Sequence, residues 1–242
     1  MREFVYLSDG KLRQFLPEPR RFVRPGAVRL NTPVGGVDVD APAADSERNR
    51  MRHLQQVDKH LNERAEWFAE PGRRPGQWVW FEAPLRWVTL RGAYQHMVLF
   101  ADPAPGTDLQ YERETGCRLL LHGSAHHLMG YAPVAVEGPP LEGVAGGSSI
   151  GATFLTTAGQ AVQALSLEHD PLAEGVQVPR TNLQGSGVHE LMDAIDTRHV
   201  PAQGAAMMSG YARVTAELPA TSSAARCLVA SPLSVEYAHD QA

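Results

Sequence analysis

The chain has 242 residues, of which 43% are hydrophobic and 20% are charged, as is usual for a folded globular protein. Its net charge of -5 lacks the basic excess that nucleic-acid binders usually carry. No apolar run approaches the roughly 18 residues needed to cross a bilayer, and the amino terminus has no signal-peptide pattern. Two cysteines are too few for a disulfide scaffold. We therefore expect a cytoplasmic protein without nucleic-acid or membrane partners.

The first part of the chain predicts a strand and two helices. Aromatic and β-branched residues at Phe4–Leu7 indicate a strand, and Ser8 can cap a short helix that ends before Pro17. A second helix is expected from Asp45 or Ser46, because apolar residues then recur at spacings of three and four. These residues are Met51, Leu54, Val57, Leu61, Ala65 and Phe68.

The middle of the chain predicts a sheet. Residues 77–101 are rich in aromatic and β-branched residues, and breaks at Pro84 and Gly92 divide them into strands whose short connections require antiparallel pairing. Residues 117–121 add another strand. Trp78 and Trp80 alternate with Val79 and Phe81. This alternation predicts that both faces of the strand are covered and favours a core role for the tryptophans over an aromatic binding platform.

The last part predicts helices at 153–167 and 189–197 and strands at 211–218 and 225–237. The polar, Gly-rich residues between the two helices indicate a loop. Together these elements predict an α+β fold with a largely antiparallel central sheet and helices on one face. We expect one domain spanning 1–242, with a mobile Gly-rich region at 138–188.

Three segments of the chain resemble a group of uncharacterised bacterial proteins common in actinomycetes. They are FVYLSDGKLRQF at Phe4–Phe15, LLHGS at Leu120–Ser124 and ASPLSVEY at Ala230–Tyr237. Only two lysines beside many arginines, glycines and prolines are typical of a high-GC genome. The resemblance implies an actinobacterial source and a match over the whole chain. It implies no reaction, because that group has no assigned function.

A second resemblance is to α/β-hydrolases. Leu119–Gly123 is similar to the strand and His-Gly turn of an oxyanion hole, and Gly147–Gly151 fits G-x-S-x-G. Ser149 would then be the nucleophile, with His122 or a later histidine such as His199 as the base. Ser149 follows His122 by only 27 positions. A single βαβ unit needs about 30 residues, so the spacing disfavours this fold.

The residues suggest a ligand site rather than a catalytic one. His122, His126 and His127 form the densest histidine cluster, with Ser124 between them. Flexible amides and hydroxyls at Gly146, Gly147, Ser148 and Ser149 precede the predicted helix at 153–167, and helix amino termini favour anions. No third ligand stands at metal-binding spacing, and no phosphate-loop or dinucleotide motif is present. We therefore expect neither a metal nor a cofactor.

Because no catalytic constellation is complete, the sequence favours a cytosolic bacterial binding or regulatory protein. We expect it to recognise a small anionic ligand or a protein partner, through a site that joins His122–His127 with Gly146–Ser149. The alternative is a serine hydrolase that acts on an ester or amide through Ser149.

Overall fold

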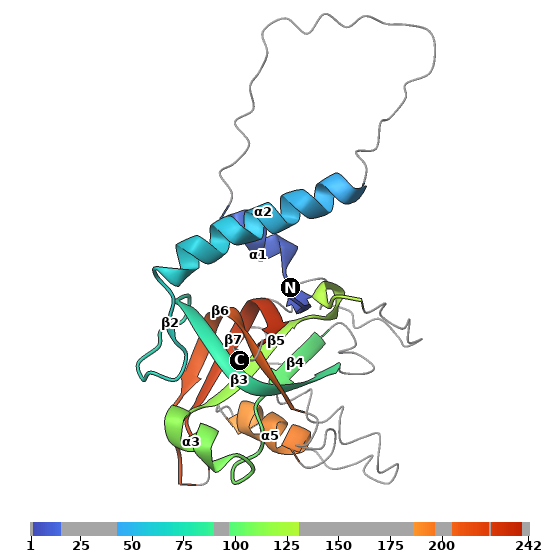
Figure 1. Ribbon diagram of the computed structural model, residues 1–242. Coiled ribbons are helices and arrows are strands. Elements are labelled where there is room, and N and C mark those ends of the chain that lie inside the picture. Colours follow the sequence, from blue (N-terminus) through green and yellow to red (C-terminus); the bar gives the residue numbers. More distant parts are fainter. Residues whose placement is uncertain are drawn as a thin grey trace, which may run out of the picture. The chain divides into compact units, whose positions relative to one another are not determined.

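The computed structural model describes residues 2–15, 43–89, 97–130, 186–196, 205–222 and 224–238. These residues fall into two compact units, a helical unit at residues 9–63 and a sheet unit formed by residues 1–8 and 64–242 (Figure 1). The predicted single domain over 1–242 stays a prediction. Among the described residues, no helix has both the length and the hydropathy to cross a membrane.

The helical unit contains α1 (Asp9–Gln14) and α2 (Ala43–Asn62). An ion pair of 2.7 Å joins Arg50 of α2 to Asp9 of α1. The apolar stripe predicted for α2 is confirmed at Leu54, Val57 and Leu61, which are all buried. The predicted extension of this helix to Phe68 is wrong, because the chain turns after α2 and its next residues pair with the sheet.

Among its described residues, the sheet unit contains seven strands and three short helical segments. The strands are β1 (Phe4–Leu7), β2 (Glu66–Trp67), β3 (Trp78–Thr89), β4 (Met97–Ala101), β5 (Arg118–Ser124), β6 (Ala206–Leu218) and β7 (Cys227–Tyr237). The helices are α3 (Leu109–Thr115), the 3-10 turn η2 (Ala125–His127) and α5 (Ser186–Ala194).

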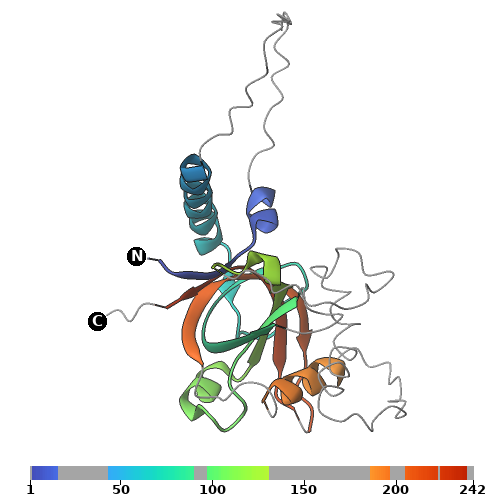
Figure 2. The same ribbon diagram turned by 90° about the vertical axis from the view of Figure 1, so that its right-hand side faces the viewer.

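Five of the strands close into a barrel. β3 pairs with β4, β4 with β5, β5 with β7, β7 with β6, and β6 pairs back to β3. Figure 2 shows the resulting ring of strands. If the strands are counted in chain order from β3, their order around the ring is 1-2-3-5-4, and the third and fifth are parallel. This is the strand order of the five-stranded OB type of Greek-key barrel.

The predicted mixture of sheet and helices is confirmed, but the sheet curls into a barrel rather than staying open. Its antiparallel character holds in part, because the pairs β5–β7 and β2–β3 are parallel. The helices also lie in different places. α5 packs on the outside of the barrel, whereas Tyr111 of α3 packs against the inner cluster.

Side chains fill the inside of the barrel. Alternate residues of each strand point inward, as the two-residue period of a strand requires. The buried inner residues include Val79, Phe81, Ala83, Leu85, Val98, Phe100, Leu119, Leu121, Ala212, Val214, Leu228 and Ala230. One inward position, Gly123, must lack a side chain, because a Cβ there would lie 2.5 Å from the hydroxyl of Tyr6. The Tyr6 ring takes that space and packs edge-on against Phe100.

A second core lies outside the barrel, where α5 covers β4, β5 and β7. Val188, Leu191, Met192 and Ile195 are buried there. They pack with outward residues of the strands, namely Met97, Leu99, Ala101, Leu120, Cys227 and Val229. The helix predicted at 189–197 is therefore present, although it begins at Ser186. Of the predicted mobile region, 186–188 belongs to α5 and 138–185 lies outside the described residues, as does the helix predicted at 153–167.

Candidate binding face

The outward side of β3 and β6 carries two matched rows of side chains. Register pairs Trp78 with Arg213, Trp80 with Tyr211, Glu82 with Ser209 and Pro84 with Met207. All eight point away from the barrel, because the residues between them belong to the inner cluster or, at Gly210, face it. We call these eight residues the tryptophan face.

Two large apolar side chains on this face are exposed. The solvent-exposed fraction is 42% for Trp80 and 44% for Met207. Glu82 and Arg213 are also exposed, and the other four residues are half-buried. The prediction from the sequence that both sides of β3 are covered is therefore wrong at Trp80. Its neighbours Val79 and Phe81 do lie in the core, but burial of one side of a barrel strand does not require burial of the other.

The exposed indole of Trp80 packs against the neighbouring indole of Trp67. Because β2 pairs in parallel with β3, Trp67 lies directly beside Trp80, and their ring centroids are 4.2 Å apart at a tilt of 46°. Arg73 fixes this corner, since its Nε donates to the carbonyl of Trp67 at 3.2 Å and its guanidinium forms ion pairs with Glu66 and Glu70. The Trp80 ring is thus kept in place by its own neighbours in the fold.

The charged residues of the face lie on either side of its aromatic centre. Arg213 donates through Nε to the carbonyl of Gly76 at 3.2 Å, which anchors one edge of its guanidinium, while the residue as a whole remains exposed. The Glu82 carboxylate takes part in none of the ion pairs formed by the described residues. One acid and one base therefore flank Trp80 and Tyr211.

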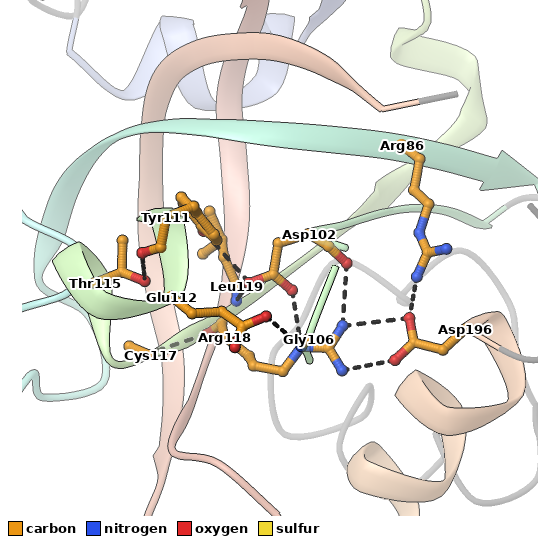
Figure 3. Close-up of polar contacts among 10 residues, drawn as sticks. All are labelled: Arg86, Asp102, Gly106, Tyr111, Glu112, Thr115, Cys117, Arg118, Leu119 and Asp196. Carbon is orange, nitrogen blue, oxygen red and sulfur yellow. Dashed lines mark hydrogen bonds and ion pairs between the residues drawn. The ribbon is translucent and has the colours of Figure 1, made fainter. Parts of the chain in front are cut away.

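On the covered side of the barrel, a buried ion network connects α5 to the strands (Figure 3). Arg118 of β5 binds Asp102 through Nε at 3.0 Å and Asp196 through Nη1 at 2.7 Å. Asp196, just after α5, also pairs with Arg86 of β3. Asp102 accepts a further bond of 2.9 Å from the amide of Leu119. Each carboxylate is thus matched by at least one guanidinium.

Burial changes the proton affinity of this network. It raises the pKa of Asp102 to about 6, although Arg118 acts in the opposite direction. Burial alone would lower the pKa of Arg118, but Asp102 and Asp196 raise it above its usual value. Because the groups are buried and bonded to one another, their arrangement serves to attach α5 rather than to receive a ligand.

The two cysteines lie near this network and are unreactive. Both are buried and free. Burial raises the pKa of Cys117 to about 11 and that of Cys227 well above its usual value. Both are therefore thiols at neutral pH, and the thiolate needed for nucleophilic attack is scarce.

The residues of the predicted histidine cluster have three different environments. His122 is fully buried on the outward side of β5, and its Nε2 shares a hydrogen bond of 2.8 Å with the Thr215 hydroxyl. Ser124 caps η2, since its Oγ accepts from the amide of His126 at 3.4 Å. His126 is exposed, and the His127 ring packs edge-on against Tyr6.

The other half of the predicted site, Gly146, Gly147, Ser148 and Ser149, lies outside the described residues, as does His199. Their predicted roles in anion binding or in a hydrolase stay predictions. Within the described part of the chain, no group of three or more histidine, cysteine, aspartate or glutamate side chains could hold a metal ion.

The tryptophan face is formed in part by tryptophans whose alternation in the sequence favoured the core. A signal for it was present, because Glu82 shares the outward side with Trp80, and Arg213 shares it with Tyr211. A charged residue in phase with an aromatic one indicates that this side of a strand meets solvent. What the pattern of one strand does not contain is the pairing of β3 with β6, which joins the two halves of the face.

The strand order of the barrel gives a further comparison. In OB barrels the face of the second and third strands binds ligands. The corresponding strands here are β4 and β5, and their outward residues Leu99 and Leu120 are packed under α5. The exposed aromatic surface lies instead on the first and fourth barrel strands.

Comparison with known proteins places the chain in a family. A model of a family of unknown function, DUF7019, matches residues 2–239. The chain belongs to this family. The expectation of an uncharacterised family is thereby confirmed, while its actinobacterial origin and the three quoted segments as its motifs stay predictions. No curated protein and no solved structure matches the chain.

Proposed function

We propose that this protein is a binding protein and that a protein partner docks on the tryptophan face. The observation that carries the proposal is the exposed Trp80, which is supported by Trp67 and lies opposite Tyr211, with Arg213 two residues further along β6. Tryptophan, tyrosine, methionine and arginine are the residue types that dominate the centres of protein interfaces. All four occur on this one rigid stretch of two paired strands.

The charges of the face favour a protein over a nucleic acid. Binding to a phosphate backbone requires several lysines or arginines whose counterions are displaced. The tryptophan face has one arginine, and a glutamate follows two positions after Trp80. Its end at Pro84 and Met207 is apolar. A partner of mixed charge with apolar side chains matches this pattern, and the protein partner expected from the sequence remains the preferred choice.

A crosslinker placed on the face tests the proposal. A photoreactive benzoylphenylalanine in place of Ser209, which is paired with Glu82 and lies two residues from Tyr211, should form a protein adduct when the full chain is irradiated in its producing cell. The same probe at Glu114, an exposed position on α3, is the control. We expect an adduct at 209 alone, and we expect Trp80→Ala to remove it. Equal yields at both positions, or no adduct at 209, would overturn the proposal.

A further inference from the structure

The geometry points to the identity of this partner: we propose that the tryptophan face binds a second copy of the same chain as a two-fold symmetric dimer. The inference rests on the proposed function and names the occupant of the same face. A two-fold interface brings one patch against itself, so the patch must be complementary to itself. The distribution of charge on the tryptophan face has this property.

The face has an apolar centre and oppositely charged flanks. Trp80 and Tyr211 lie directly opposite one another on β3 and β6. Two residues further along β3 is Glu82, while Arg213 lies two residues from Tyr211 on β6 in the opposite direction. Outward residues two apart on a strand are separated by about 6.6 to 6.8 Å. The carboxylate and the guanidinium therefore flank the aromatic pair at similar distances on opposite sides.

This arrangement selects one orientation for two copies. A two-fold axis that lies in the plane of the face, runs roughly perpendicular to the strands and passes through the midpoint between Trp80 and Tyr211 exchanges the two ends. It places Glu82 of one copy at the Arg213 end of the other, and symmetry repeats the contact. A copy docked without this reversal would bring Glu82 near Glu82 and Arg213 near Arg213. Like charges at an interface cost free energy, so the reversed orientation is favoured.

The centre of such a dimer would be formed by Trp80 and Tyr211, and Met207 would add apolar surface at one end of the face. Trp80 and Met207 are 42% and 44% exposed, and a second copy would remove this apolar surface from water. Trp67 keeps the Trp80 ring in place. The salt bridges at the rim would fix the orientation, while burial of the aromatic centre would supply most of the affinity.

Charge reversal gives a sharp test by analytical ultracentrifugation of the full chain. Wild type should sediment as a dimer. By symmetry, Glu82→Arg places two repulsive contacts in the dimer, and so does Arg213→Glu. Each variant should raise the dissociation constant at least about tenfold, which corresponds to about 1.4 kcal/mol. An equimolar mixture of the two variants should restore a dimer, because both contacts in the mixed dimer are again between opposite charges.

Two controls accompany this test. Glu114→Arg reverses an exposed charge on α3, away from the face, and should leave the dimer unchanged. Circular dichroism of each variant checks that it is folded. A wild-type monomer at micromolar to millimolar concentration would overturn the inference. A dimer that both charge reversals leave intact, or a mixture that stays dissociated, would also overturn it.

The crosslinking experiment separates this inference from the proposed function. An adduct at position 209 with the mass of two copies supports both. An adduct with a different protein, together with a wild-type monomer, leaves the proposed function standing and overturns the dimer. The absence of any adduct together with a monomer overturns both.

Discussion

The two outward sides of the barrel are built from neighbouring strands but have opposite surroundings. Over β4, β5 and β7, the apolar residues of α5 bury the strands, and the ion network around Arg118 attaches the end of the helix. Over β3 and β6, Trp80 and Met207 are exposed. The difference shows that strand alternation separates the inside of a barrel from its outside but does not determine whether the outside is covered.

Strand β3 runs from the exposed outer side of the barrel to the side that α5 covers. Along the outward residues of β3, Trp80 and Glu82 are exposed, Pro84 is half-buried, and Arg86 is buried in its ion pair with Asp196. The cover of α5 thus begins within β3. Outward residues at the start of β3 are therefore candidates for an interface, whereas those at its end belong to a core.

The largest loss of stability is expected from a substitution of Arg118 on the covered side of the barrel. Arg118→Ala would leave Asp102 fully buried without its guanidinium and would detach one of the two arginines from Asp196. Removal of one partner from a buried ion pair costs about 3 to 5 kcal/mol. We expect a loss of this size in the free energy of unfolding, measured by urea denaturation.

Arg113→Ala is the matched control, because Arg113 is exposed on α3 and bonds only to a carbonyl of its own helix among the contacts described. Its loss should cost less than about 0.5 kcal/mol. If Arg118→Ala were as mild as this control, the network would not be what holds α5 on the barrel.

The elements of the fold were largely predictable, and the reason lies in local pattern. The strands at Phe4–Leu7 and Tyr211–Leu218 and the stripe of α2 show the periods of their structures directly. The closure of the barrel was not predictable in this way. It depends on β6 returning to β3 and on the parallel pairing of β5 with β7, contacts between residues more than 100 positions apart.

The tryptophan face was also beyond what local sequence patterns can predict. Trp80, Glu82 and Tyr211 were all visible in the sequence, but their juxtaposition is fixed only by the register of β3 against β6. The ion network likewise joins Arg86, Asp102, Arg118 and Asp196 from four separate segments. His122 was likewise visible as part of a histidine cluster, but its hydrogen bond with Thr215 joins residues 93 positions apart and no local pattern contains it.

A smaller effect on the covered side should appear as a pH dependence. Burial raises the pKa of Asp102 to about 6, above its unfolded value. The folded state therefore binds the Asp102 proton more tightly, and this group's contribution to stability rises as the pH falls from 7.5 to 5. The expected gain is about 1 kcal/mol. It is measured as the free energy of unfolding of wild type minus that of Asp102→Asn at each pH. A difference that falls with decreasing pH would mean that Arg118 outweighs burial and lowers the pKa.

The smallest effect on folding is expected on the exposed side, at Trp80. Trp80→Ala removes a ring that is 42% exposed and loses mainly its contact with Trp67, an aromatic pair contributing about 0.5 to 1.5 kcal/mol. Phe81→Ala, one position along the same strand, empties part of the barrel core and should cost about 3 to 5 kcal/mol. Urea denaturation, carried out at a protein concentration low enough for the chain to be monomeric, compares the free energies of unfolding of the two variants. If the two losses were equal, Trp80 would be a core residue. A small loss at Trp80 combined with dissociation of the dimer means that the ring is retained for association rather than for folding.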